Sequence, residues 1–366
     1  MKKVLLASTA LVLSAGIASA QGVSITGSAE MGFKDDGTFE GTSVAGTAPQ
    51  DSGVEFHTDI NVDFMMSGET DGGLSFGAEI GLEEAAGGVA TDVEDDFTVF
   101  ISGDFGTLTM GDTDGALDWA MTEVLANSGS INDDEEHAAY NGNAGLDGSL
   151  DGQILRYDYS FGDFAFALSA ELNDLQANTT VAGSNQDDIF GIGVTYSADL
   201  GGVDLGLGLG YQSGGYDGPD LFIAAAGNPV ATGEYDADIW GVSVTAAVAD
   251  FDFRLNYSDL DGTATIANSG PGGAGQTIEW DHIGVGVGYT FDAVSLHLNY
   301  GEVDGTHSVA GAFEASGWGF TAGYDLGGGA EIQFGYGSSD RLANATGAAN
   351  PDRDQDTWSL GLSFSF

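Results

Sequence analysis

Apolar and polar residues alternate along most of this chain, and the alternation continues to its last residue. Between Val54 and Met66 the apolar side chains occupy even positions, while His57, Asp59 and Asp63 lie at odd ones. The final segment, 358–366, alternates in the same way and ends on Phe366. A period of two is typical of β-strands with one apolar and one polar face. The sequence therefore predicts an all-β protein.

The connections between these strands alternate in length. Short turns are predicted near 68–73, 104–105, 162–163, 199–202, 250, 292 and 327–329. Long acidic or glycine-rich loops are predicted near 35–52, 84–95, 112–151, 174–186, 213–234, 261–277, 304–314 and 340–354. Together they delimit about sixteen strands of roughly ten residues, the antiparallel layout of an outer-membrane β-barrel with short periplasmic turns. A barrel of about 16–18 strands encloses an aqueous channel.

A secreted β-sandwich is the alternative for any single strand. Two features favour the barrel for the whole chain. Ionisable residues such as Glu79, Arg156 and Arg254 lie in the middle of strands, on the polar parity, and cannot all be buried in a dry core. Aromatic residues lie at both ends of the apolar parity, as the two interfaces of a bilayer favour. Trp280 is an exception, because its parity points inward unless a bulge intervenes.

The two ends of the chain fit this architecture. Residues 1–20 combine two lysines, an apolar run and the cleavage pattern Ala18-Ser19-Ala20, which predicts a secretory signal peptide. The mature barrel then spans 21–366. Its last strand, Trp358–Phe366, is predicted to pair with the first, Val23–Lys34, so that no sheet edge stays open.

Composition excludes several classes of function. The chain carries 57 acidic and seven basic residues, a net charge of −50, and such a surface repels nucleic acids. It has no cysteine, which excludes disulfide frameworks and thiol catalysis. Five histidines are present, but no G-x-S-x-G motif accompanies them, so an enzyme is not expected.

The segment 112–151 is the longest interruption of the alternation. A loop of this length is usually functional or disordered. It either folds into the barrel and narrows the lumen, or forms an acidic surface loop, and the residues alone leave both possibilities open. Its candidate constriction residues are all acidic: Asp114, Asp118, Glu123, Asp133, Asp134, Glu135 and Glu136.

Four segments carry a family resemblance. They are FMMSGETDGGLSFGAEIGL (64–82), FTVFISGDFGTLTMGD (97–112), WGFTAGYDLGGG (318–329) and the C-terminal LGLSFSF. They resemble general diffusion porins of Gram-negative bacteria, in particular the alphaproteobacterial type. The resemblance implies a sixteen-stranded barrel, integral to the outer membrane, that assembles as a homotrimer and passes small hydrophilic solutes. It also implies that the third external loop, here 112–151, folds inward as an eyelet.

The chain departs from that family in its basic residues. In the family, basic groups on the wall face the acidic loop, whereas here only Arg156, Arg254 and Lys34 are available, with His57, His282 and His297 as weaker candidates. The predicted pore wall also includes Asp59 and Asp63. A carboxylate-dominated pore favours cations. We therefore expect a cation-preferring channel of low specificity. A substrate-selective channel, such as one for sugars, is the alternative.

External loops contain further carboxylates, among them Asp35-Asp36, Asp92–Asp96, Asp187-Asp188, Asp352 and Asp354. Solvated loop charge is the simpler explanation. Ca²⁺ would suit such clusters and could bridge them to lipopolysaccharide. No other cofactor is expected.

Overall fold

The computed structural model describes residues 22–37, 53–83, 97–126, 129–150, 152–173, 187–217, 234–264, 275–308, 311–343 and 353–366. The predicted signal peptide and the carboxylates Asp92–Asp96 and Asp352 lie outside these ranges. Within them, no helix is long and apolar enough to cross a membrane.

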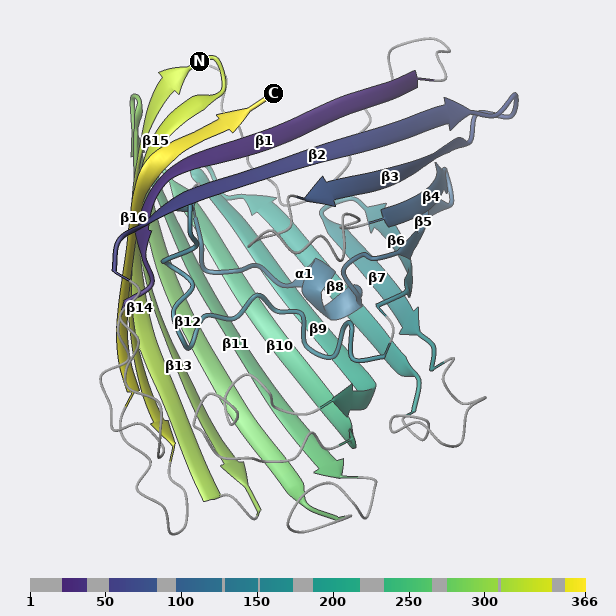
Figure 1. The fold of residues 1–366 in the computed structure, drawn as a ribbon. Coiled ribbons are helices and arrows are strands. Elements are labelled where there is room, and N and C mark those ends of the chain that lie inside the picture. The colour runs from purple at the N-terminus through teal and green to yellow at the C-terminus, as the bar shows by residue number, and fades with distance from the viewer. Residues whose placement is uncertain are drawn as a thin grey trace.

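Sixteen antiparallel strands within the described residues form one closed barrel, with each strand paired to its neighbours in sequence and β1 paired to β16 (Figure 1). The bounds are β1 Gly22–Asp35, β2 Glu55–Glu69, β3 Ser75–Glu83, β4 Phe97–Gly103, β5 Gly106–Gly111, β6 Ile154–Phe161, β7 Phe164–Glu171, β8 Ile189–Asp199, β9 Val203–Asp217, β10 Glu234–Val248, β11 Phe251–Ala264, β12 Thr277–Phe291, β13 Val294–His307, β14 Gly311–Gly327, β15 Ala330–Ala343 and β16 Arg353–Ser365. A short helix, α1 Ala116–Ala120, lies between β5 and β6.

The first and last strands close the ring as predicted. Ser28 lies opposite Ser365, and Asp35 lies opposite Trp358 at the other end of the pair. The seven short turns also lie where the sequence predicts them, for example at 104–105 between β4 and β5. Both the fold class and the number of strands are confirmed.

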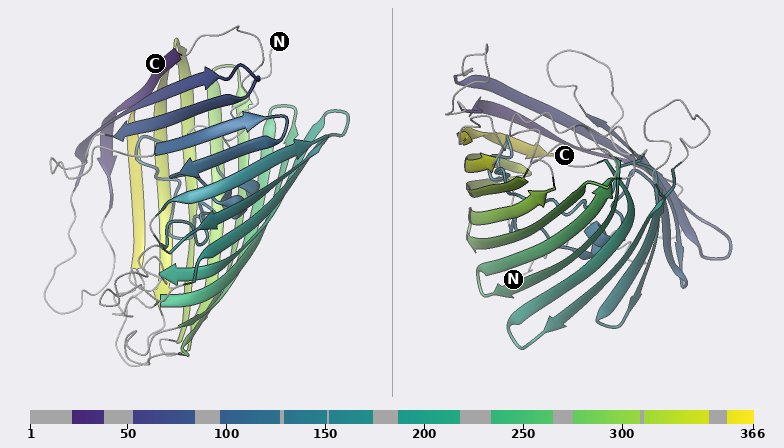
Figure 2. Two further views of the ribbon diagram at one scale, coloured as in Figure 1. Left: turned by 90° about the vertical axis from the view of Figure 1, so that its right-hand side faces the viewer. Right: turned by 90° about the horizontal axis from the view of Figure 1, so that it is seen from below.

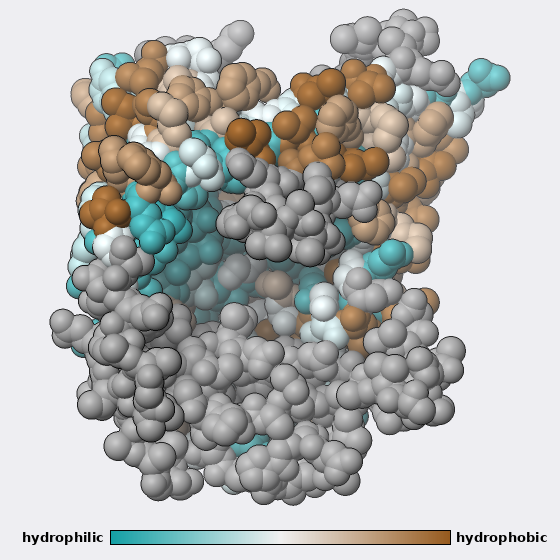
Figure 3. Space-filling view, viewed as in Figure 1, coloured by the Kyte–Doolittle hydropathy of each residue, from teal (hydrophilic) through white to brown (hydrophobic). Residues whose placement is uncertain are grey.

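The two faces of the wall differ as the alternation predicts. Large apolar side chains on the outward parity are exposed, including Phe56 at 84% and Phe161 at 74% of their surface. In Figure 3, hydrophilic residues line the hollow at the centre, and hydrophobic residues gather on the outside over β1 and β2. The outward face is therefore the one that suits lipid, and the inward face suits water.

Several strands extend beyond their predicted ends. β9 continues to Asp217, β11 to Ala264 and β13 to His307, and only 308–310 separate β13 from β14. The loops predicted to begin at 213, 261 and 304 are therefore shorter than expected. The reason is that the outward parity becomes acidic there, as at Asp259 and Asp304, while backbone pairing continues. The hydrophobic pattern ends where the apolar band ends, but the hydrogen-bonded ladder does not.

Strand length divides the barrel into a short wall and a tall wall. Strands β3 to β7 have only 6–9 residues each. Strands β9 to β15 have 14–17 residues each. The difference is visible in Figure 1, where β3 to β7 are the short arrows at the right. We call these two regions the short wall and the tall wall below.

Candidate functional site: an acidic loop inside the barrel

The described residues of the segment 112–151 lie inside the barrel. Both views in Figure 2 place α1 within the ring of strands. α1 buries Ala116, Leu117 and Ala120, which recur on one face of the turn, and it packs on β8 and β9. Of the two possibilities that the sequence left open for this segment, the inward fold is the one seen.

The loop crosses the tall wall twice. Its outward run passes Met121 beside Gly241 of β10 and Val124 beside Gly286 of β12, and brings Ile131 against Gly32 of β1. Its return run passes Glu135 beside Gly319 of β14 and returns Leu146 to β9, where the Leu146 N–H donates to Gln212 Oε1 at 2.8 Å. The lumen is consequently narrowed from the side of the tall wall.

Apolar packing holds the loop against the wall, in addition to its polar contacts. Leu117, Met121, Ala139 and Leu146 of the loop belong to one buried cluster with inward-facing residues of the wall. The wall members are Ile189, Tyr235, Ala237, Ile239, Leu260, Ala264, Ile278, Val303, Phe313 and Ala315. Trp280 packs against this cluster, so its inward parity is confirmed and the β12 register runs through it without a bulge. This part of the inner wall is thus apolar, although the alternation of apolar and polar residues predicts a polar inner face.

Side chains of the wall also bind the loop backbone. Ser169, Ser243 and Ser339 accept hydrogen bonds from the backbone N–H groups of Ala116, Thr122 and Ala138 at 2.9, 3.0 and 2.9 Å. His282 Nε2 lies 2.9 Å from the oxygen of Ala139, and Asn299 Nδ2 donates to the oxygen of Glu135 at 3.2 Å. The sequence offered His282 only as a weaker basic candidate and gave no sign of the three serines or Asn299, because isolated polar residues on the polar parity carry no pattern that distinguishes them.

The two predicted arginines lie behind the loop rather than opposite it. Arg156 Nη1 donates to the oxygen of Asp114 at 2.5 Å and to Thr113 Oγ1 at 3.2 Å. Arg254 Nη1 donates to the oxygens of Leu125 and Glu123. Each guanidinium also lies beside a wall carboxylate, 3.7 Å from Asp158 and 2.9 Å from Asp252 respectively. Both arginines therefore anchor the loop.

The other predicted wall residues lie on the lumen-facing parity of β1 and β2. Lys34 Nζ is 3.2 Å from Asp36, and His57 Nε2 is 3.6 Å from Glu30. Asp59 accepts a hydrogen bond from Asn61 Nδ2 at 3.0 Å, and Asp63 lies 3.4 Å from the Thr26 hydroxyl. Each basic group among these residues and the two arginines has an acidic neighbour, whereas Asp59 and Asp63 have only neutral hydrogen-bond donors in these contacts.

The seven loop carboxylates divide into two sets. Asp114, Asp133 and Glu136 are exposed to the lumen, and Asp118 and Glu123 are partly exposed. Asp134 and Glu135, which the sequence predicts to present carboxylates to the solute, are 3% and 0% exposed and face the wall instead. The Ser130 hydroxyl donates to both carboxylates, at 3.3 Å to Asp134 and 2.7 Å to Glu135. The run 133–136 turns here, so adjacent acids point in opposite directions.

Burial raises the pKa of several of these carboxyls. Desolvation raises the pKa of Asp118 to about 8, with the charges of Asp114, Asp147 and Glu123 adding to it. It also raises the pKa of Glu135 and of Glu136 to about 7, and Asp133 adds to both shifts. Burial lowers the pKa of His137 to about 4, so this loop histidine is neutral at pH 7. The ionisation of the loop therefore changes near neutral pH.

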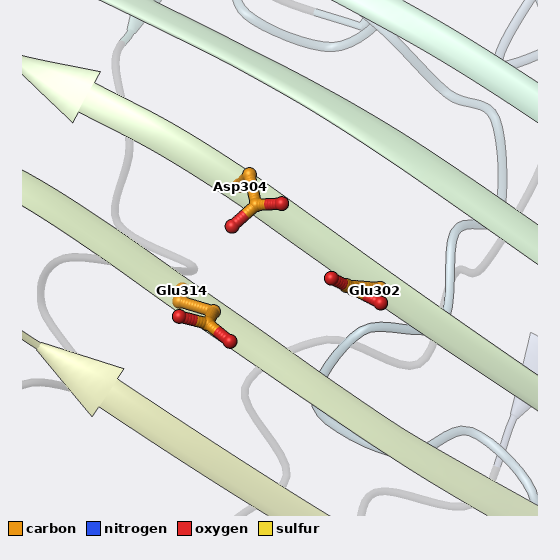
Figure 4. Close-up of side chains that lie close together, drawn as sticks. All are labelled: Glu302, Asp304 and Glu314. Atoms are coloured by element: carbon orange, nitrogen blue, oxygen red, sulfur yellow. The ribbon is translucent and has the colours of Figure 1, made fainter.

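A separate group of acids lies on the outward face. Asp259, Asp281, Asp304 and Glu314 occupy directly opposed positions on β11, β12, β13 and β14. Carboxylate oxygens of Glu302, Asp304 and Glu314 lie within 4.8 Å of one another (Figure 4). Directly opposed like charges destabilise a sheet unless a cation offsets them. Among the described residues, this is the group whose geometry could hold a metal ion.

The family model for Gram-negative porins matches residues 7–344. The chain belongs to the Gram-negative porin family. It is an integral outer-membrane β-barrel, as the sequence predicts, and the recognition of the family from its sequence segments is confirmed.

Individual relatives agree with this assignment. The porin is 28% identical over 318 residues to a porin of Rhodobacter capsulatus, covering 85% of this chain and 93% of that one. A porin structure refined at 1.8 Å resolution matches with a TM-score of 0.64 and 22% identity, over 94% of this chain and all of that chain. The trimer form of OmpT from Vibrio cholerae matches with a TM-score of 0.62 and 12% identity, over 94% and 99%. The last two likenesses show the fold.

Proposed function

We propose that this porin forms a water-filled channel for the passive diffusion of small hydrophilic solutes and ions, with a preference for cations. The observation that supports it is the division of charge in the lumen. Arg156 and Arg254 are covered by the loop, whereas Asp114, Asp133 and Glu136 on the same loop are exposed. Carboxylates that line a pore with no basic side chains opposite them attract permeating cations and repel anions.

The charge on the opposite side of the lumen supports the same preference. Asp133 lies close enough to Asp59 and His57 for their charges to affect its pKa. Glu30 and Asp59 are acidic, so β1 and β2 present carboxylates toward the loop rather than a cluster of arginines. A transverse field from acid to base, which the family resemblance implies, is therefore not expected in this porin.

A planar-bilayer measurement tests the proposal. The purified porin is reconstituted between two KCl solutions of unequal concentration, and the reversal potential is recorded. We expect the sign that corresponds to K⁺ crossing more readily than Cl⁻. Anion preference, or the absence of any channel, would contradict the proposal. As a matched control, Asp325→Asn lies near the end of β14, next to the short turn to β15, and should leave the reversal potential unchanged.

The alternative of a sugar-selective channel receives less support. A sugar channel usually displays aromatic rings along the wall of its lumen. The inward-facing rings Tyr235, Trp280 and Phe313 of the tall wall pack in or against the buried cluster instead. Conductance that is blocked by a sugar in the micromolar range would favour the alternative.

We also propose that the porin is a homotrimer whose subunits meet at the short wall. A strand of seven residues rises about 23 Å along its own axis, and tilting of about 40° reduces its height below the ~25 Å apolar band of a bilayer. Phe97, Val99 and Met110 on this wall nevertheless expose 43%, 58% and 52% of their surface. Contact with a second subunit would cover these side chains where the strands are too short to match the bilayer.

A bound divalent cation remains a further proposal. The predicted clusters Asp35-Asp36, Asp187-Asp188 and Asp354 are distributed over separate strand ends, whereas Glu302, Asp304 and Glu314 converge. Ca²⁺ accepts oxygen ligands of this kind and could link the outward acids to anionic lipopolysaccharide. If so, EDTA should lower the temperature at which the trimer dissociates, and added Ca²⁺ should restore it. An unchanged dissociation temperature would contradict this proposal.

A further inference from the structure

The loop contacts the wall of the barrel between β8 and β15 mainly at glycines. Five of its backbone oxygens, those of Ala116, Ala120, Val124, Asp134 and Ala139, each point at one lumen-facing glycine. The glycines are, in the same order, Gly193 of β8, Gly208 of β9, Gly286 of β12, Gly337 of β15 and Gly301 of β13. A Cβ atom built on any of these glycines would lie only 1.9–2.2 Å from the oxygen that faces it. No side chain fits between strand and loop at these places.

The separations have a physical explanation. In a glycine, an α-hydrogen takes the position that Cβ has in other residues. At these five glycines that hydrogen faces the oxygen of the loop. This is the arrangement of a Cα–H···O=C contact, which has a C···O distance of about 3.3–3.6 Å. Since the arrangement recurs at five strands, it is a consistent mode of contact rather than one accidental approach.

Side chains of the loop use the same row of glycines. Leu117 lies over Gly210, Met121 over Gly241, and Ile131 between Gly32 and Gly361. Many of the glycines are also direct neighbours across the sheet: Gly193 pairs with Gly210, and Gly210 with Gly241. On the far side, Gly284 pairs with Gly301, and Gly301 with Gly317. We call this set of lumen-facing glycines the glycine track.

β11 shows what happens where the track is interrupted. Its inward residues at this level are Asn256 and Ser258, which pair with Gly284 and His282 of β12. Here the loop contacts the wall through side chains, and Asn141 Nδ2 donates to Ser258 Oγ at 2.9 Å. The Arg254 guanidinium also fits beneath the outward run at this strand. With side chains on the wall, the loop backbone is held one side-chain layer away.

We propose that the glycine track sets the width of the pore, because it lets the loop lie with its backbone directly on the wall. Gly193, Gly208, Gly286, Gly301 and Gly337 are then positioning residues for permeation, and solute need not touch them. A methyl group requires about 3.5 Å from its neighbours. Alanine at any of these positions therefore displaces the loop toward the lumen and reduces the free cross-section. The inference rests on the proposed function, since it concerns the path that solutes would take.

Alanine substitutions test it. Gly286→Ala and Gly193→Ala are compared with Gly206→Ala, a control on the lumen-facing side of β9. At Gly206 the added Cβ would meet the rotatable hydroxyl of Thr245 rather than the loop. Single-channel conductance and the size limit for neutral solutes should fall in both test variants, fall further in the double variant, and stay unchanged in Gly206→Ala. Unchanged conductance in both test variants, or an equal loss in the control, would overturn the inference.

A distance measurement separates this inference from the proposed function. Because the chain has no cysteine, spin labels can be placed specifically at Glu136→Cys on the loop and Glu79→Cys on β3. The label distance should shorten in Gly286→Ala relative to the labelled parent, whether or not the protein conducts. The same distance in both would overturn the inference, even if cation preference were established. Failure of the parent protein to conduct would instead count against the proposed function alone.

Discussion

The tall and short walls enclose one lumen but have different roles. The tall wall carries most of the glycine track, most of the wall residues of the buried apolar cluster, and Arg254, which binds the loop backbone; the second arginine, Arg156, binds the loop from β6 of the short wall. The short wall consists of strands of 6–9 residues and has apolar side chains on its outer face. On the proposals made above, the tall wall determines pore geometry, while the short wall serves contact between subunits. Four predictions test or refine this division, beginning with the largest expected effect.

A charge introduced between the loop and the tall wall should release the loop from that wall. Leu146 is fully buried in the cluster, and an aspartate there leaves an unpaired carboxylate in an apolar site, at a cost of at least about 3 kcal/mol. We expect Leu146→Asp to form a folded barrel with higher and noisier single-channel conductance. The matched control is Ala144→Asp, at an exposed position of the same loop. Wild-type conductance in Leu146→Asp would show that the cluster does not hold the loop.

The second prediction concerns the short wall. Arginine at an outward-facing position costs about 2–4 kcal/mol at the middle of a bilayer, and a subunit contact there would be lost. Val99→Arg on β4 should therefore yield folded monomers in detergent. Phe253→Arg on the outward face of β11 should retain the trimer in the same detergent, because no subunit contact is assigned to the tall wall. Heat-modifiable gel electrophoresis and size-exclusion chromatography distinguish the two states, and the reverse pattern would assign the interface to the tall wall.

Third, removing an arginine beneath the loop should affect its position more than the ion preference. Arg254→Gln loses charge-assisted hydrogen bonds to two backbone oxygens, and such bonds contribute about 1.5–3 kcal/mol each. We expect more fluctuation of the open-channel current and a small change of reversal potential. Glu136→Gln, which changes an exposed charge, should have the opposite profile. A larger shift of reversal potential in Arg254→Gln than in Glu136→Gln would show that the arginine reaches the lumen.

The smallest expected effect is the dependence of ion preference on pH. Burial raises the pKa of Glu136 and of Glu135 to about 7, so both ionise as the pH rises from 6 to 8. Cation preference should increase over this range, and Glu136→Gln should reduce the increase. Conversely, a carboxyl whose pKa is higher in the folded protein binds more protons when folded, so stability falls as the pH rises from its unfolded pKa toward 7. The loop should thus be held more firmly at pH 5 than at pH 8.

The sequence was sufficient for the architecture but not for the interior of the loop. Each strand has one face toward lipid and one toward water. The apolar residues at every second position therefore predict which side chains point outward. In the loop no such repeat exists, and Asp133, Asp134, Glu135 and Glu136 are chemically alike although two face the wall. The G-x-G pairs at 191–193, 284–286 and 335–337 were present on the lumen-facing parity. Their meaning became evident only once the loop was seen to lie against them.

The closure of the barrel has a consequence for how the protein is made. Ser28 is paired with Ser365, so the contact that completes the ring joins the first and the last of the sixteen described strands. Contacts between residues far apart in the sequence make folding slow, because the entropy of the intervening chain must be lost before they form. Until the last strand arrives, β1 has a free edge that can pair with other chains. Synthesis and export must therefore deliver the whole polypeptide, kept from aggregating, before any channel exists.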